Sequence, residues 1–211
     1  MIAPFLGRLP FIAILRGVRP AEVVSIAAAL VDEGFTIVEV PLNSPDAMKS
    51  IAALTHALGD DVLVGAGTVR TTEQVRQSAD VGGRLVVMPH GDPDVVRAAR
   101  AQGLSCVPGV ATPTEGFAAL ANGADALKLF PAELLTPSVL RAYRSVFPSD
   151  ASFIPVGGIV PGSLAAYLAA GASGFGLGSA LYRAGDEPAA VAASARSFVA
   201  AWRDIGGSAS I

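Results

Sequence analysis

Short apolar runs alternate with longer amphipathic segments along the whole chain. The apolar runs are rich in β-branched residues and carry few polar positions, which is typical of strands covered on both faces in a parallel sheet. We therefore predict strands at residues 11–15, 36–40, 63–66, 85–88, 105–107, 126–130, 153–156 and 174–177.

Segments with helical periodicity separate these strands. They include residues 21–33, 45–58, 92–102, 137–146, 161–170 and 188–205. Prolines stand at or near several of the expected helix starts, where the missing N–H is tolerated. Glycines such as Gly34 and Gly171 stand where a helix gives way to the next strand, because glycine readily adopts the backbone conformation that ends a helix.

Eight strand-then-helix units predict the fold. That many units in about 200 residues favour a compact α/β domain, a (β/α)8 TIM barrel. We expect one domain over residues 1–211, since no linker-like stretch divides the chain, with residues 206–211 as a flexible tail. A doubly wound open sheet is the alternative fold.

Composition narrows the class of protein. The 211 residues are 52% hydrophobic, which is enough for one sizeable core. A net charge of -3 and a pI near 5.3 argue against nucleic acid as a partner. The single cysteine, Cys106, excludes an internal disulfide and fits a reducing cytoplasm.

Several signals are missing from the sequence. We see no signal-peptide pattern and no run of about 18 apolar residues, so we expect a cytoplasmic protein without a membrane segment. No group of His, Cys and carboxylate residues has metal-ligand spacing, and we expect no metal. Gly65-Ala66-Gly67 lacks the third glycine and the acidic partner of a dinucleotide site, and we expect no cofactor.

Polar or glycine residues interrupt the apolar pattern near the end of nearly every expected strand. In a barrel of parallel strands, chemistry occupies the carboxyl-terminal ends of the strands. Polar residues scattered at random through the core would not all lie at the same end of the strands. In chain order these positions are Arg16, Glu39, Thr68, His90, Pro108-Gly109, Lys128, Gly157-Gly158 and Gly178-Ser179.

Lys128 is one of only two lysines in the chain, and it lies inside an expected buried strand. Burial of a charged amine is costly and lowers its pKa from about 10.4, which favours the free amine that attacks carbonyl groups. We therefore predict a Schiff-base lysine. The alternative is a structural lysine whose stem is buried while its head reaches water.

Two further charged residues end expected strands. Glu39 lies in an apolar run and needs a partner or a raised pKa; we favour a general acid/base, against a structural ion pair with Arg16 or Lys128. Arg16 directly follows the first strand and can hold a carboxylate through its planar fork. The alternative for Arg16 is an ordinary surface arginine.

Glycine-rich segments follow the last two strands. Gly157-Gly158 and Gly178-Ser179 let backbone N–H groups approach a phosphate, and loops in these positions form the usual phosphate site of such barrels. Tight turns are the alternative role. Thr68 can bring a hydroxyl to a ligand or cap the helix expected near Thr72.

In combination, the motifs resemble those of the Schiff-base-forming 2-keto-3-deoxy-6-phosphogluconate and 2-keto-3-deoxy-6-phosphogalactonate aldolases. The resemblance extends over nearly the whole chain, from Pro10 to about Arg203. It rests on Ile12-Ala13-Ile14-Leu15-Arg16-Gly17, Val38-Glu39-Val40-Pro41-Leu42-Asn43-Ser44-Pro45, Gly65-Ala66-Gly67-Thr68-Val69, Ala126-Leu127-Lys128-Leu129-Phe130-Pro131, Val156-Gly157-Gly158-Ile159 and Gly176-Leu177-Gly178-Ser179.

The resemblance implies a metal-free, homotrimeric barrel that cleaves a phosphorylated keto-deoxy sugar acid to pyruvate and D-glyceraldehyde 3-phosphate. It implies that Lys128 forms the Schiff base and that Glu39 is the acid/base residue. The residues that it assigns to substrate are Arg16 and Thr68 at the keto-acid end, Gly157, Gly158, Gly178 and Ser179 at the phosphate, and also Pro89, Phe130 and Val156.

Within this family the chain looks more like the phosphogalactonate branch. Pro41-Leu42-Asn43-Ser44-Pro45 stands where gluconate-type enzymes carry a Thr-Leu-Arg-Thr pattern, and Val156 stands where they carry threonine. The two substrates are epimers at C4, and valine cannot bond the C4 hydroxyl. Met88-Pro89-His90 also departs from the gluconate type, and the role of His90 stays open.

Three other functions remain as alternatives. The first is the gluconate-type aldolase. The second is a phosphate-binding barrel isomerase or synthase in which Lys128 acts only through its charge, which predicts no covalent trapping. The third is a non-catalytic sugar-phosphate sensor, which predicts binding without turnover.

Overall fold

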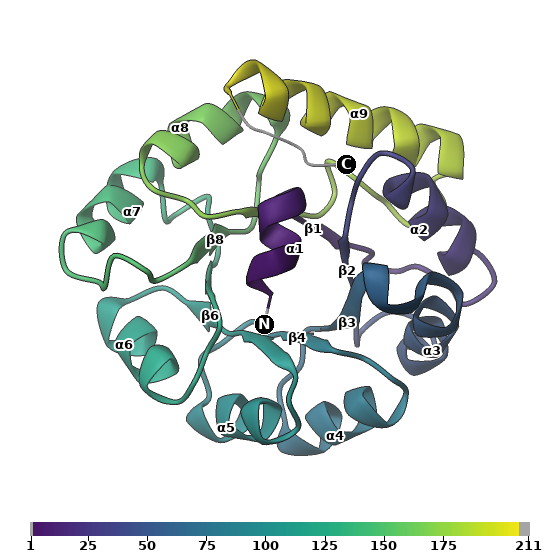
Figure 1. Cartoon of the computed structure of the whole chain (residues 1–211), viewed down its shortest axis with the longest axis horizontal. Helices are drawn as coiled ribbons and strands as arrows, with labels where there is room; N and C mark the ends of the chain where they lie inside the picture. The colour runs from purple at the N-terminus through teal and green to yellow at the C-terminus, as the bar shows by residue number, and fades with distance from the viewer. Residues whose placement is uncertain (1, 207–211) are drawn as a thin grey trace.

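The computed structural model describes residues 2–206 and shows parallel strands curled around a centre, with helices outside them (Figure 1). One sheet has the order β5-β4-β3-β2-β1-β9 and the other the order β6-β7-β8. All the pairings between strands are parallel. The strands are β1 (Phe11–Ile14), β2 (Ile37–Pro41), β3 (Leu63–Gly67), β4 (Leu85–Val87), β5 (Ser105–Val107), β6 (Gly109–Val110), β7 (Leu127–Leu129), β8 (Phe153–Pro155) and β9 (Phe175–Leu177).

The predicted α/β fold with parallel strands is confirmed, and the strand positions agree to within about two residues. The sequence pattern did not predict β6, which only Pro108 separates from β5. The full eight-stranded barrel stays a prediction. Of the predicted flexible tail at 206–211, residues 207–211 lie outside the described residues.

The helices form the outer layer around the strands. They are α1 (Ala3–Arg8), α2 (Val23–Val31), α3 (Ala47–Leu58), α4 (Thr72–Asp80), α5 (Pro93–Ala101), α6 (Pro113–Ala121), α7 (Pro137–Arg144), α8 (Leu164–Ala169) and α9 (Pro188–Asp204), with short 3-10 turns at Gly59–Asp61 and Pro161–Ser163.

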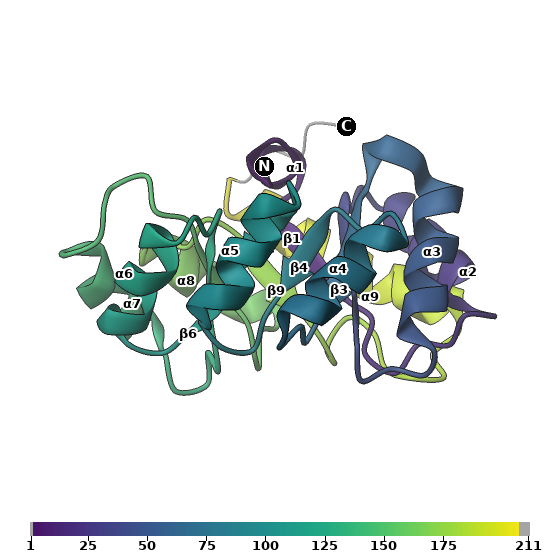
Figure 2. The same ribbon diagram turned by 90° about the horizontal axis from the view of Figure 1, so that it is seen from below.

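Helix α1 is the exception to this arrangement, and the sequence pattern did not predict it. It lies across one end of the curled strands, as the two views show (Figures 1 and 2). Its residue Leu6 and the preceding residue Ile2 are buried in the same cluster as side chains of the strands. Because α1 leads directly into β1, it closes the amino-terminal end of the strands and leaves their carboxyl-terminal end open.

Side chains alternate along the strands between two apolar clusters. Leu127 and Leu129 belong to the large cluster between strands and helices. The inner cluster gathers one set of alternating residues, including Ile12 and Ile14 of β1 and Ile37 of β2. Because strand residues two apart point to the same face, Glu39 and Lys128 belong to the inner face.

Candidate active site

A cavity of about 360 Å³ opens beyond the carboxyl ends of β1, β7, β8 and β9. Most of the residues predicted to bind substrate meet there, although they come from distant parts of the chain. The lining residues are Ile14, Arg16, Lys128, Phe130, Glu133, Val156, Gly157, Gly158, Ile159, Val160, Gly178, Ser179, Ala180 and Arg183.

Lys128 enters the cavity from the middle of β7. Its residue surface is only 6% exposed, and its Nζ atom lies 4.6 Å from the ring centre of Phe130. Burial lowers the pKa of the amine, and Arg16 lowers it further, while the Glu39 carboxyl opposes them. A larger share of free amine is therefore present at neutral pH than on an exposed lysine.

Glu39 lies on the inner face of β2, beside Ile14 of β1 in the strand register, and is 1% exposed. Burial raises its pKa to about 7, against the opposing charges of Lys128 and Arg16. Among the described residues its Oε2 atom has no hydrogen-bond partner. A carboxyl with this pKa exists in both protonation states near neutrality, as a residue that accepts and returns protons requires.

Gly67 makes room for the Glu39 carboxyl. It lies at the end of β3 beside β2, and a Cβ atom at this position would fall 1.7 Å from Glu39 Oε2. Gly67 therefore has a role that its glycine-rich sequence context did not reveal. Any larger residue must push the carboxyl out of its place.

Arg16 is held at the cavity edge by polar neighbours. Its Nη1 atom donates to Asn43 Oδ1 at 2.6 Å and its Nη2 atom donates to Thr68 Oγ1 at 3.5 Å. Thr68 has a φ of 56°, a strained conformation for a residue with a branched side chain. Such strain is maintained where the surrounding structure requires a particular side-chain position.

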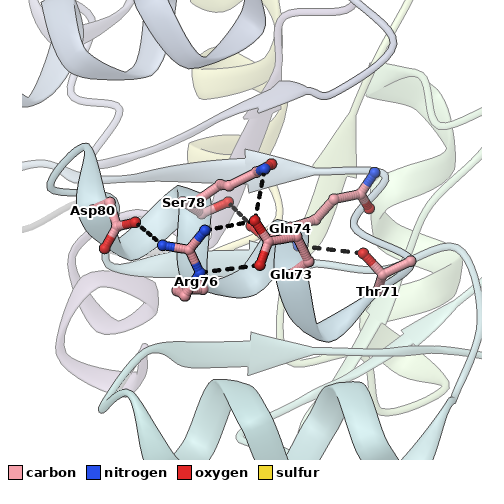
Figure 3. Close-up of polar contacts among 7 residues, drawn as sticks. Thr71, Glu73, Gln74, Arg76, Ser78 and Asp80 are labelled. Carbon is pink, nitrogen blue, oxygen red and sulfur yellow. Dashed lines mark hydrogen bonds and ion pairs between the residues drawn. The ribbon is translucent and has the colours of Figure 1, made fainter.

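Thr68 does not cap the following helix. That role belongs to Thr71, whose Oγ1 accepts the Gln74 N–H at 3.2 Å (Figure 3). The same helix has a surface network in which Arg76 bonds both Glu73 and Asp80 (Figure 3). These contacts satisfy α4 without Thr68, so its hydroxyl is available to Arg16.

The glycine segments meet on one wall of the cavity. Gly157 and Gly158 both have positive φ angles, and their α-carbons lie against the Glu133 side chain. Gly176, in contrast, makes room for Val156, because a Cβ there would lie 2.6 Å from Val156 Cγ2. This part of the cavity wall thus combines the backbone of Gly157 and Gly158 with the apolar side chain of Val156.

Eight of the eleven predicted site residues line the cavity, and three do not. Glu39 is buried next to the lining residue Ile14, Thr68 contacts the lining residue Arg16, and Pro89 lies against Gly109. The exposed His90 has no place in the lining.

Sequence reasoning did not single out Asn43, Glu133 or Arg183 as site residues. Asn43 lies in the segment that separates the two branches of the resemblance, which was the one available signal. Glu133 and Arg183 follow strand ends by a few residues, and only the folded loops bring them to the cavity.

The part of the chain that the structure describes offers neither a metal site nor a membrane-spanning helix. Residues 2–206 contain no group of three or more His, Cys, Asp and Glu side chains placed to hold a metal ion. Within the same range, no helix is long and apolar enough to span a membrane.

The fold and the cavity define an α/β enzyme that holds a buried lysine amine and a buried carboxyl on the inner face of its curled parallel strands. The family described as "KDPG and KHG aldolase" matches residues 2–191. The chain belongs to this aldolase family.

Known relatives agree with this assignment. The 2-dehydro-3-deoxy-6-phosphogalactonate aldolase of Escherichia coli (strain K12) is 46% identical over 93% of this chain and 96% of its own length. A solved structure described as "Native KDPGal structure" is also 46% identical, covers 94% of this chain and 97% of its own, and has a TM-score of 0.93.

A more distant solved relative carries chemical information. It is the KDPG aldolase from Legionella pneumophila, with pyruvate captured as a covalent carbinolamine intermediate. It is 26% identical, covers 97% of this chain and 98% of its own, and has a TM-score of 0.82.

Proposed function

We propose that this protein is a class I aldolase that cleaves 2-dehydro-3-deoxy-6-phosphogalactonate to pyruvate and D-glyceraldehyde 3-phosphate. The observation that carries the proposal is the pairing of Lys128 and Glu39 on the inner face of the strands, each with a pKa moved towards neutrality. The 46% identity to an aldolase for this substrate supports it, as does the captured carbinolamine in a family member.

The reaction begins at the Lys128 amine. Nζ attacks the C2 ketone to form a carbinolamine, and loss of water gives an iminium. Arg16 binds the neighbouring carboxylate, with Asn43 and Thr68 fixing its orientation. Glu39 is buried and is not among the lining residues, so we infer that it exchanges protons with the substrate through a water molecule.

Cleavage follows from the iminium. The C4 hydroxyl loses its proton towards Glu39, the C3–C4 bond breaks, and its electron pair moves into the iminium to give an enamine. D-glyceraldehyde 3-phosphate leaves. Protonation of the enamine at C3 and hydrolysis of the imine then release pyruvate and restore the free amine.

Phosphate binding is assigned to the wall formed by Gly157, Gly158, Gly178 and Ser179. Their backbone N–H groups can donate to phosphate oxygens. Binding energy so far from the reacting bond orients the substrate and lowers the barrier to reaction. Because the Phe130 ring centre lies 4.6 Å from Lys128 Nζ, we infer that this ring packs beside the reacting carbons.

Val156 is the proposed specificity residue, because it is 6% exposed and lines the cavity two residues beyond the inner-face residue Ile154. Val156→Thr adds a hydroxyl with little change of volume. We expect the ratio of kcat/KM values to shift roughly tenfold towards the gluconate epimer. The measurement is pyruvate release from each epimer, with Val156→Ala as a control that lacks the hydroxyl. An unchanged ratio, or an equal shift in the alanine variant, would contradict this role.

Gly67→Ala tests the position of Glu39. The added Cβ must displace the carboxyl, so we expect kcat for pyruvate release to fall about tenfold or more, with a smaller change in KM. Gly162→Ala is the matched control, because a Cβ there meets no atom within 4 Å. Equal kcat values in the two variants would show that Gly67 does not position the carboxyl.

The test of the whole proposal is pyruvate release from the purified protein with each of the two C4-epimeric keto acids. Preference for the galactonate epimer supports the proposal. Preference for the gluconate epimer keeps the chemistry and overturns the specificity. Release from neither rejects the aldolase, and the isomerase or the sensor would then explain the site better.

The architecture around the site is also part of the proposal. We propose one domain, a closed (β/α)8 barrel in which β5 and β6 are one strand interrupted at Pro108. A bridge between Val156 and Gly176 supports closure, and so does the Ser173 N–H, which donates to the Phe153 carbonyl.

The assembly and the location complete the proposal. We propose a cytoplasmic homotrimer that uses no metal or cofactor. Exposed large apolar side chains support association with further copies, because Leu134 is 74% and Val160 46% exposed.

A further inference from the structure

A charged residue outside the expected set lines the cavity. Arg183 lies in the loop between β9 and α9, five residues beyond Gly178. Its Nε atom donates to the Ser179 carbonyl at 3.1 Å. This bond holds the guanidinium beside the glycine wall, the part of the lining formed by Gly157, Gly158, Gly178 and Ser179. No partner of its terminal Nη atoms is found among residues 2–206.

The loop that carries Arg183 is anchored on both sides. The Arg183 N–H donates to Asp186 Oδ2 at 2.8 Å, and the Asp186 N–H donates back to the Arg183 carbonyl at 2.9 Å. The buried Tyr182 donates to Glu22 Oε1 at 3.3 Å, which ties the loop to the start of α2. The backbone of Arg183 is thus positioned before any ligand arrives, which lowers the entropic cost of binding.

The charges of the cavity lining show why this residue matters. The ionisable lining residues are Arg16, Lys128, Glu133 and Arg183. The proposed substrate carries a carboxylate and a phosphate, and the phosphate has a charge of about -1.5 to -2 at pH 7. Arg16 is assigned to the carboxylate, and Lys128 must be a neutral amine when it attacks the ketone.

Glu133 increases the need for a cation at the phosphate end. Its side chain lies against Gly157 and Gly158, and these backbone donors are neutral. A carboxylate beside a bound phosphate is unfavourable unless a positive charge lies close to both. Arg183 is the remaining fixed cation in the lining.

We propose that Arg183 binds the phosphate group of the substrate and sets the preference of this enzyme for phosphorylated over unphosphorylated sugar acids. The inference rests on the proposed aldolase function and adds to it a residue from the β9–α9 loop. The two terminal nitrogens of the guanidinium match two phosphate oxygens, and the backbone N–H groups of the glycine wall bind the others.

The test compares one substrate with and without its phosphate. For Arg183→Gln we expect the ratio of kcat/KM values, phosphorylated over unphosphorylated, to fall roughly 10- to 100-fold, mainly through KM. The value for the unphosphorylated acid should stay within about twofold of wild type. Arg183→Lys should recover part of the ratio, because an ammonium group also binds phosphate.

Arg141→Gln is the matched control, since Arg141 is an exposed arginine outside the cavity lining. An unchanged ratio in Arg183→Gln would overturn the proposal, and so would an equal loss on both substrates, which indicates a structural role.

A measurement of phosphate binding by thermal unfolding separates an error about Arg183 from an error about the aldolase function. Inorganic phosphate that binds the native protein raises its Tm. We expect this increase in wild type and Arg141→Gln, and little of it in Arg183→Gln. The phosphate measurement does not need turnover, so it decides on Arg183 even if no pyruvate is released. An equal Tm increase in Arg183→Gln would overturn the proposal.

Discussion

Replacing Lys128 by methionine is expected to lower the rate of pyruvate release on the order of 10⁴-fold or more, because Lys128 carries the only primary amine among the described residues that line the cavity. Methionine fills a similar volume without charge, so the fold should be retained. Lys128→Arg should be equally inactive, since a guanidinium stays protonated and does not attack carbonyls. The measurement is the single-turnover rate with the galactonate epimer.

The chain offers a matched control for this residue. Lys49 is the only other lysine, and its exposed side chain pairs with Asp46 at 3.3 Å. Lys49→Met should keep full activity. Borohydride added with pyruvate should label one peptide, the one with Lys128, in wild type and Lys49→Met and none in Lys128→Met. Label on Lys49, or on no lysine of the active wild-type protein, would refute the Schiff-base assignment.

Replacing Glu39 by glutamine is expected to lower kcat by about 10²- to 10⁴-fold. Glutamine keeps the shape of the side chain and fits the space beside Gly67, but it neither accepts nor returns a proton. Borohydride trapping with pyruvate should still label Lys128, although more slowly. Loss of all labelling together with loss of folded structure would show a structural role instead.

The pH profile separates proton transfer from packing. Burial raises the pKa of Glu39 to about 7, so the carboxyl is protonated below this value and ionised above it. A residue that accepts the C4 hydroxyl proton works in its ionised form. The wild-type rate should therefore rise as the pH increases through about 7, and this rise should be absent in Glu39→Gln. The same rise in rate in the variant would mean that a group other than Glu39 titrates.

Much of the fold was predictable because its signal is local. Continuous apolar runs such as the one around Lys128 indicated strands covered on both faces, and prolines and glycines marked the ends of helices. Helix α1 was missed for the opposite reason. It is six residues long, and it is stabilised because Ile2 and Leu6 are buried against side chains of the strands. That contact has no local periodic signal.

The candidate site was partly predictable in the same way. Lys128 and Glu39 stood out because a charge in an apolar run needs an explanation, and their shared inner face follows from strand alternation. Arg183 gave no such signal, because an arginine in a polar loop is ordinary. Gly67 could not be assigned to the Glu39 carboxyl either, since 28 positions separate the two in the sequence and the parallel pairing of β2 with β3 brings them together.

The sequence by itself determined the alternation of strands and helices apart from α1 and β6, the strand ends at which polar groups gather, and the two buried ionisable residues. These depend on hydrophobic periodicity and on the cost of burying charge, which act on each segment separately. Only the tertiary structure decided which residues share the cavity and how the pKa of Glu39 rises to about 7. Those properties depend on burial and on charges brought together across the strands, and no single segment contains them.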